Sequence, residues 1–511
     1  MMKLRKPKKI TLHPIMAFVI LILATLVLSS ILGAFGLQSN YTIINSLRGN
    51  LENVLVTVTP LFNLSGLKLI FRTTVSNFAS FAPLSMLLIT LIGIGIMDKS
   101  GFLESFFALL TKNASKFRVT LTLSFITIIA SIAGDMSYIA LIPIMALLFK
   151  YSHRNPKAGI IMAFAGLTCG TSINIFASSI DSALLEYTTL AAKSLDSAYT
   201  ISTLGYLFVM ILMTIIMSIV VANITEKIII PKLGKYEVES TEEFYLDKHK
   251  KRGLLFSLTV GTVYLLIFAY NIIPGLPLSG NLLDYSQNLY IDKLFGYNSF
   301  FNQGFVFIVT MLFFLCGLFY GLGAKTIKNN RDVCSYLGHS LDGIGRTIVL
   351  IFFASTLISI VKDSNIGNVA ASLLANMISN FNMSGIPLII ITFIVVAIVT
   401  LLVPSPVTAW SIMSSTIVPV FMGAGMSAEF ANLVFRAGEC ATYGLTPLMA
   451  YFVIYLAFLD QYEEDDKRIN LFSSIKNILP YAGATAIIWI VVLILFYIIG
   501  LPIGIGTSPV I

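Results

Sequence analysis

The sequence predicts an all-α integral membrane protein with about nine transmembrane helices and two re-entrant hairpins in an inverted-topology repeat. Of its 511 residues, 57% are hydrophobic and only 11% are charged, and the mean hydropathy is +0.88. A soluble domain averages about 25% charged residues, so a soluble globule is excluded. Apolar runs long enough to cross roughly 30 Å of hydrocarbon recur along nearly the whole chain. One order of elements (helix, amphipathic stretch, interrupted hairpin, broken helix) occurs twice.

The distribution of charged residues, cysteines and histidines argues against a nucleic-acid-binding protein, a disulfide-rich protein and a zinc or haem protein. The net charge of +8 comes from basic residues in short loops beside apolar runs, which indicates membrane orientation rather than a nucleic-acid partner. The four cysteines are scattered and the four histidines lie near loop edges, so neither a disulfide framework nor a zinc or haem site is expected. We expect no cofactor. A cytoplasmic N-terminus is predicted from Lys3, Arg5, Lys6, Lys8 and Lys9.

The first two predicted units cover residues 1–82 and 83–202. The first unit contains a helix over 13–36 and an external segment, 37–82. The second contains a helix over 83–97, an amphipathic stretch over 101–117 and an apolar run over 118–149 that is interrupted near Asp135. Both flanks of that run are basic, so two crossings or one hairpin fit, and the carboxylate favours a re-entrant hairpin. The run 158–197 is too long for one straight helix and is broken at 168–182.

Three further units complete the chain. Residues 203–345 contain helices over 203–226, 253–274 and 304–323, with a charged cytoplasmic loop over 227–252. Residues 346–460 contain a helix over 346–361, an amphipathic stretch over 366–382, a run over 385–422 broken at 404–406, and a run over 427–459 with polar residues in its middle. Residues 461–511 begin with a charged segment (463–468) that we place inside, followed by a helix over 478–500 and an uncharged tail outside.

The two copies of the repeat show a weak sequence similarity. IGIMDKSGFLESFFALLTKNASKF corresponds to LISIVKDSNIGNVAASLLANMISNF, and the copies start from opposite sides of the membrane. An inverted repeat is typical of secondary transporters and predicts a site where the broken helices meet near the bilayer midplane.

The first broken helix carries oxygen donors suited to a hard cation. Hydroxyl, amide and carboxylate groups suit Na⁺, although hydroxyls in such helices also simply bond neighbouring helices. An ionisable residue inside the membrane is costly, which favours a functional role for Asp181. We expect a coupling ion, Na⁺ or H⁺, at Asp181, Glu439, Ser172, Thr171 and Asp135, with Na⁺ placed at Asn174, Asp181 and Glu439.

The second broken helix carries an arginine and an acid at i, i+3. Arg436 and Glu439 share one helix face, which permits a plain structural ion pair. Alternatively, Arg436 receives an anionic substrate while Glu439 binds a cation or proton. The substrate site is predicted to contain Arg436, Asn174, Ser405, Trp410 and Pro447. For Trp410, packing and stacking on an aromatic ligand are equally good interpretations.

Three segments of the chain resemble the p-aminobenzoyl-glutamate transporter (AbgT) family. They are PLSMLLITLIGIGIMDKSG (83–101), AGLTCGTSINIFASSIDSALL (165–185) and FRAGECATYGLTPLMAYF (435–452). The resemblance implies a homodimer in the bacterial inner membrane that is driven by proton or sodium gradients. It also implies uptake of p-aminobenzoyl-glutamate or efflux of sulfonamide antimetabolites.

By position, this family's functional carboxylate, arginine, second acid and proline fall on Asp181, Arg436, Glu439 and Pro447. Two positions depart from the family pattern. The second acid is usually Asp, so Glu439 reaches one methylene further, and Ala409 occupies a position that is usually Lys.

Two alternative functions are compared with this expectation. A dicarboxylate or short-chain fatty acid transporter, or a Na⁺/H⁺ antiporter of the same superfamily, is the alternative within transport. The alternative from another class is a membrane-embedded enzyme, but the sequence lacks HExxH, GxGD and a P-loop, so we expect a transporter of a small anionic or aromatic solute in the lipid bilayer.

Overall fold

The computed structural model describes residues 12–45, 50–111, 114–202, 204–234, 236, 247–296, 298–381, 383–463 and 470–511. The basic N-terminal residues Lys3, Arg5, Lys6, Lys8 and Lys9 lie outside this range, as does most of the predicted inside segment 463–468. Within the described residues the chain is helical apart from one two-stranded sheet and short bridges.

The predicted repeat is present as a repeated order of helices. Each copy has a long helix, a shorter helix, two antiparallel hairpin arms and two halves of a broken helix. The first copy consists of α3 (Ala82–Lys99), α4 (Phe102–Thr111), α5 (Lys116–Ala130), α6 (Asp135–Tyr151), α7 (Pro156–Gly170) and α8 (Ser179–Lys193). The second consists of α15 (Gly345–Asp363), α16 (Ile366–Asn380), α17 (Gly385–Leu402), α18 (Pro406–Gly423), α19 (Ala428–Thr442) and α20 (Phe452–Gln461).

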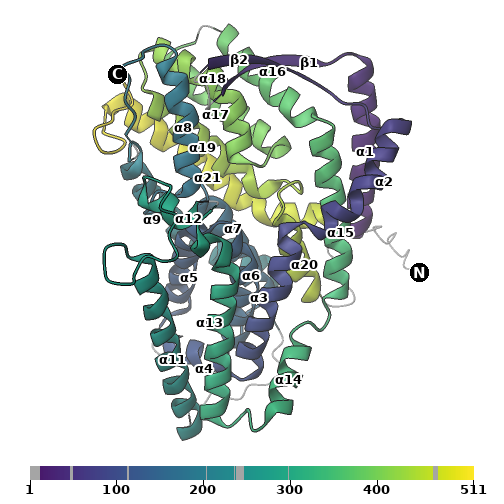
Figure 1. Cartoon of the computed structure of the whole chain (residues 1–511), viewed down its shortest axis with the longest axis vertical. Coiled ribbons are helices and arrows are strands. Elements are labelled where there is room, and N and C mark those ends of the chain that lie inside the picture. The colour runs from purple at the N-terminus through teal and green to yellow at the C-terminus, as the bar shows by residue number, and fades with distance from the viewer. Residues whose placement is uncertain are drawn as a thin grey trace, which may run out of the picture.

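In each copy, one hairpin arm packs against one half of the broken helix of the other copy. Hairpin arm α18 packs against α8 of the first copy, and hairpin arm α6 packs against α20 of the second. In Figure 1 the first hairpin lies in the lower half of the molecule and the second in the upper half, with α7 and α19 near the centre between them. The broken helices therefore lie where the two copies meet.

The remaining helices surround this centre. They are α1 (Pro14–Ala34), α2 (Leu64–Ala79), α9 (Leu207–Ile224), α10 (Ile230–Leu233), α11 (Lys248–Ile272), α12 (Tyr290–Phe295), α13 (Phe300–Ala324), α14 (Asn330–His339) and α21 (Leu471–Ile499). Helices α11 and α13 pack with α3 at the lower end in Figure 1, whereas α1 and α2 pack with α15 at the right.

Among the described residues, ten helices are long and apolar enough to cross a membrane. These ten include three hairpin arms, α5, α17 and α18, and omit the four shorter halves of the broken helices. When the hairpin arms are set aside and each broken helix counts as one crossing, the number agrees with the expected nine.

Helices α7 and α19 form the interior of the protein. Every residue of α19 from Ala428 to Ala441 is buried, and so is every residue of α7 except Lys157. A helix that is buried on all sides must be enclosed by other helices. Polar residues on these two helices are therefore withdrawn from both lipid and bulk water.

The structure corrects two of the predicted segments. The expected external segment 37–82 contains a hairpin of β1 (Gln38–Asn45) and β2 (Asn50–Thr57), followed by α2. Burial alternates along β2, with Val56 buried and its neighbours Leu55 and Thr57 exposed, which is the period-two pattern of a strand. The expected loop 227–252 is shorter, because α9 continues through a π-helical turn (Thr225–Ile229) and α10 as far as Leu233.

The last residues pack back onto the protein instead of forming a free tail. Ile505 N–H donates to the Leu204 carbonyl (3.1 Å), and Phe208 N–H donates to the Ile503 carbonyl (3.1 Å). Ser427 N–H, at the start of α19, donates to the Pro509 carbonyl (3.0 Å). We call residues 503–511 the C-terminal strap, because they join the start of α9 to the start of α19.

Candidate functional site

The two broken helices unwind at the same place in the molecule. Helix α7 ends at Gly170 and α8 begins at Ser179, whereas α19 ends at Thr442 and continues as a single 3₁₀ turn (Tyr443–Leu445). The Cys440 thiol donates a hydrogen bond to the Cys169 carbonyl (3.4 Å), which joins the last turns of α7 and α19. A Cβ at Gly170 would lie only 2.5 Å from the Ser131 hydroxyl oxygen, so a glycine lets the first hairpin approach this break.

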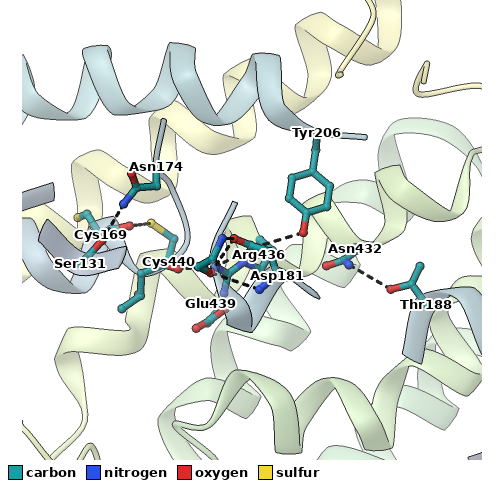
Figure 2. A network of polar contacts seen from close by, with 12 residues as sticks. Ser131, Cys169, Asn174, Asp181, Thr188, Tyr206, Asn432, Arg436, Glu439 and Cys440 are labelled. Atoms are coloured by element: carbon teal, nitrogen blue, oxygen red, sulfur yellow. Dashed lines mark hydrogen bonds and ion pairs between the residues drawn. The ribbon is translucent and has the colours of Figure 1, made fainter. Parts of the chain in front are cut away.

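A buried arginine joins the two breaks (Figure 2). The Arg436 guanidinium lies 3.1 Å from Asp181 Oδ1 and 2.9 Å from Glu439 Oε2. It also donates to the carbonyl of Thr171, in the unwound segment after α7. The three ionisable side chains are at most 2% exposed. The structure thus brings together the predicted residues Arg436, Asp181, Glu439 and Thr171.

The Asp181 carboxylate is held at the N-terminus of α8. It forms a capping box with Ser178, whose backbone N–H (2.8 Å) and hydroxyl (2.7 Å) both donate to Oδ2. The Tyr206 hydroxyl, at the start of α9, donates to Oδ1 over 3.4 Å. Tyr206 is missing from the sequence prediction because nothing in its local sequence relates it to Asp181.

The buried cluster has an unbalanced charge. One guanidinium faces two carboxylates, so the cluster carries a formal charge of −1 when both acids are ionised. Among the described residues, Arg436 Nε has no hydrogen-bond partner, and the Ser172 hydroxyl and Glu439 Oε1 have no partner apart from each other. A buried charge without compensation is costly, so the site is suited to bind a cation or a proton. The adjacent oxygens of Glu439 and Ser172 are ligands that a hard cation prefers.

Asn174 ties the first break to the tip of the first hairpin. Its amide nitrogen donates to the carbonyls of Ile128 (3.3 Å) and Ile129 (3.1 Å) and to the Ser131 hydroxyl (3.3 Å). Its oxygen accepts from the Ile175 N–H. Both polar atoms of this predicted ligand are thus engaged in holding the hairpin against α7.

Asp135 lies at the N-terminus of α6, on the far side of the hairpin turn. Its exposed carboxylate forms a side-chain hydrogen bond with Tyr451, which stacks on Tyr138 with ring centroids 5.1 Å apart. Tyr138 is buried, and both Asp135 and Glu439 lie in its vicinity. Asp135 therefore neighbours the charged cluster without belonging to it.

Trp410 is a packing residue between the second hairpin and α8. Its indole N–H donates to the Thr188 hydroxyl (2.9 Å) and the Leu184 carbonyl (3.2 Å), and its ring lies 4.6 Å from that of Phe435. The side chain is fully buried. Of the two interpretations of Trp410, this geometry favours packing.

Two other predicted substrate residues serve as local backbone breaks. Ser405 caps α18 by accepting from Thr408 N–H (3.5 Å). Pro447 follows Thr446, whose hydroxyl donates to the Leu401 carbonyl at the end of α17 (2.8 Å). This bond holds the break after α19 against the first arm of the second hairpin.

A second polar group holds the start of α19. The buried Glu429 carboxylate accepts from the Tyr199 hydroxyl (2.8 Å) and from Ser202 N–H (3.3 Å), both in the connection between α8 and α9. Burial, together with the neighbouring Glu429, raises the pKa of Tyr199 to about 12. The phenol therefore stays neutral and able to donate.

Comparisons with known proteins identify the family of the chain. A model of the AbgT putative transporter family matches residues 8–511. The chain is 27% identical over 498 residues to the p-aminobenzoyl-glutamate transport protein of Escherichia coli (strain K12), a match that covers 97% of this chain and 94% of the relative. Two solved structures are also similar. The YdaH transporter of Alcanivorax borkumensis shares 27% identity (96% and 100% of the two chains, TM-score 0.48), and Neisseria gonorrhoeae MtrF, described as illuminating a class of antimetabolite efflux pumps, shares 28% (98% of both chains, TM-score 0.49).

Proposed function

The chain belongs to the AbgT family of membrane transporters, and on that premise we propose that it is a secondary active transporter coupled to Na⁺ or H⁺. Its solute carries a carboxylate and an aromatic or other apolar body, of which p-aminobenzoyl-glutamate, named for the Escherichia coli relative, is the first example to test. Export of sulfonamide-like antimetabolites is the corresponding efflux reaction.

The observation that carries this proposal is the buried cluster of Arg436, Asp181 and Glu439. Arg436 is the one positively charged group in the cluster, and both acids compete for it. A cation or proton on Glu439 weakens its hold on Arg436, which leaves guanidinium N–H groups free for a solute carboxylate. Binding of the ion and binding of the solute then favour each other, which is the coupling that symport requires.

The ligand set supports Na⁺ without excluding a proton. Glu439 Oε1, the Ser172 hydroxyl and carbonyls of the unwound segment 171–178 offer oxygens from one small region. Protonation of Glu439 would remove the same excess negative charge, and it would need no other oxygen atoms as ligands. The two ions therefore differ in their need for Ser172. Its hydroxyl would be a ligand of Na⁺, whereas a protonated Glu439 carboxyl would not require it.

We also propose a homodimer in the bacterial inner membrane, with the N-terminus in the cytoplasm. The basic residues that precede α1 support the orientation. A broad apolar surface on α11, which includes Leu255, Leu258, Leu265 and Leu266, is exposed in the single chain and is suited to lipid or a second copy. In such an assembly the hairpins and broken helices would move against the outer helices.

Flux into proteoliposomes tests the function. The purified protein should accumulate labelled p-aminobenzoyl-glutamate when a Na⁺ or pH gradient is imposed, and removing the gradient should abolish accumulation. Arg436→Gln and Asp181→Asn should each reduce the flux to background. Lys362→Gln, an exposed lysine at the end of α15, is the matched control and should transport normally. Unchanged flux in both site variants would reject this site, and Ser172→Ala separates Na⁺ from H⁺ coupling.

A further inference from the structure

A partly open pocket of about 340 Å³ lies away from the Arg436 cluster, between α3, α6, α20 and the connection from α14 to α15. We call it the side chamber and define it by Leu91, Asp98, Lys99, Leu147, Lys150 and His339. Asp98 and Lys99 belong to the MDKSG segment, which is distinctive in the sequence and has no place in the central site. In Figure 1 the helices α3, α6 and α20 lie next to one another in the lower half of the molecule.

The side chamber has a mixed lining, in which apolar side chains stand beside two lysines and two acids. Leu91 and Leu147 contribute apolar surface from α3 and α6, while Lys99 and Lys150 stand in the last turns of the same two helices. Pro143, Leu147 and Lys150 follow the i, i+4, i+7 spacing, so α6 presents one continuous face to the cavity.

The acids of the side chamber already have partners, but the lysines do not. The Tyr151 hydroxyl donates to Asp98, and His339 Nδ1 lies 2.7 Å from Asp342. In the described part of the chain, neither Lys99 nor Lys150 forms an ion pair. Two ammonium groups therefore remain available beside the apolar part of the pocket, which fits an anion with an apolar body.

A purely structural role explains less of this arrangement. A lysine in the last turn of a helix is stabilised by the helix dipole, and this accounts for the positions of Lys99 and Lys150 along their helices. Lys362 occupies the matching position at the end of α15, in the second copy of the repeat, yet it does not line the side chamber. The dipole does not account for the placement of two lysines without an ion pair, from two different helices, at one pocket.

The side chamber is connected to the central site by two helices. Pro143 lies eight residues after Asp135 on α6, about 12 Å along the helix axis. Tyr451 directly precedes α20 and forms a side-chain hydrogen bond with Asp135. Phe458, seven residues later on α20, lines the chamber.

We propose that the side chamber is a second binding site for the transported solute, an organic anion whose carboxylate contacts Lys99 and Lys150 and whose apolar part enters the cavity. This inference rests on the proposed transport function and adds a site to it. The chamber is built from α3 and the α14–α15 connection on one side and from α6 and α20 on the other, so its volume depends on how these groups of helices are placed.

Photolabelling of the intact protein tests the inference. The probe is p-azidobenzoyl-glutamate, and chymotryptic peptides are examined for label by mass spectrometry. Label should appear on peptides that contain 143–150 or 458–462, in addition to the central segment 435–447. Lys99→Gln and Lys150→Gln should each reduce labelling of the chamber peptides about tenfold, as expected for the loss of one charge-assisted hydrogen bond. Lys362→Gln is the control and should leave it unchanged.

A second variant removes the cavity without changing charge. Leu147→Trp should block chamber labelling while label on 435–447 persists, and its melting temperature shows whether it has folded. Absence of label from the chamber peptides of the unaltered protein, or equal labelling in the lysine variants, would overturn the second site. Failure of the transport proposal is a separate result: flux is absent and 435–447 is unlabelled, whatever the chamber peptides show.

Discussion

Arg436, in the second copy of the repeat, forms an ion pair of 3.1 Å with Asp181, in the first copy. Both side chains are almost completely buried, and the same guanidinium also binds Glu439 and the Thr171 carbonyl. One positive charge therefore compensates acids from two broken helices. The stability of this centre and the binding of ligands to it depend on the same contacts.

Removing the arginine should destabilise the protein strongly. Arg436→Gln leaves two buried carboxylates without a counterion, which costs about 3–5 kcal/mol in comparable buried pairs. The double variant Arg436→Gln/Asp181→Asn should recover part of this loss, because one of the uncompensated charges is gone. The measurement is chemical unfolding in detergent. Arg154→Gln, which breaks the partly buried pair with Glu226, is the control and should not be rescued by Asp181→Asn. Strict additivity of the two central substitutions would contradict direct pairing.

Much of this centre is predictable from the sequence, because its residues interrupt apolar runs. Asp181, Arg436 and Glu439 are conspicuous in segments that are otherwise hydrophobic, and the interruptions near Asp135 and Pro404 fall at real hairpin turns. Repetition of the element order then places the two breaks together. What the sequence leaves open is which copy supplies the partner of each charge.

The parts that escape prediction depend on contacts between distant segments. The C-terminal strap is held through backbone groups, and backbone hydrogen bonds leave no periodic pattern of side chains. The hairpin of β1 and β2 lies in the expected external segment 37–82, and it escapes prediction because two strands in a polar segment give a weak signal. Tyr206 and Thr188 acquire their roles only from the fold, which brings them to Asp181 and Trp410.

Sodium should stabilise the protein through Glu439. If Na⁺ binds the folded state, raising its concentration to a hundred times the dissociation constant adds about 2.7 kcal/mol. The melting temperature should then rise when choline is replaced by Na⁺, and Glu439→Gln should abolish this rise. Lys362→Gln should retain it. A melting temperature that depends on pH but not on Na⁺ in the unaltered protein would assign the coupling to protons.

Trp410→Phe should affect stability more than solute recognition. The substitution removes the indole donor to Thr188 and Leu184, and one lost buried hydrogen bond costs about 1–3 kcal/mol. We expect a lower melting temperature with an unchanged KM for the solute. In a double-mutant cycle, Thr188→Val and Trp410→Phe together should lower the stability by less than the sum of their separate effects. A large rise in KM without a change in stability would instead indicate that the indole contacts the solute.

Gly504→Ala should loosen the C-terminal strap. A Cβ at this position would collide with the backbone of Leu204 and Gly205, and overpacking of this kind costs about 1–3 kcal/mol. Limited proteolysis should then cut near residue 504 more rapidly. Gly483→Ala in α21 is the matched substitution: its Cβ meets no atom within 4 Å, and alanine favours a helix, so stability should be equal or higher. Equal resistance of both variants to proteolysis would show that the strap does not need this close approach.

Alkaline pH should weaken the contact between Tyr199 and Glu429. The pKa of Tyr199 is raised by burial to about 12, from an unfolded value of 10.0, so the folded state holds the phenolic proton more tightly. Its contribution to stability is complete below pH 10 and is lost as the pH rises to 12. The melting temperature of the unaltered protein should therefore fall more steeply than that of Tyr199→Phe across this window. If the melting temperatures of the two proteins fall in parallel between pH 10 and 12, the raised pKa of Tyr199 is contradicted.

The shared arginine also constrains how such a protein could have arisen by duplication. The first broken helix contributes an acid and no arginine, whereas the second contributes an arginine and another acid. Two identical half-length subunits could form this centre only if each carried both kinds of residue. When fragments of the present chain are produced separately, the first would insert Asp181 into the bilayer without its counterion, whereas the second would keep the Arg436–Glu439 pair, so recombination of the two would be needed to restore a working molecule.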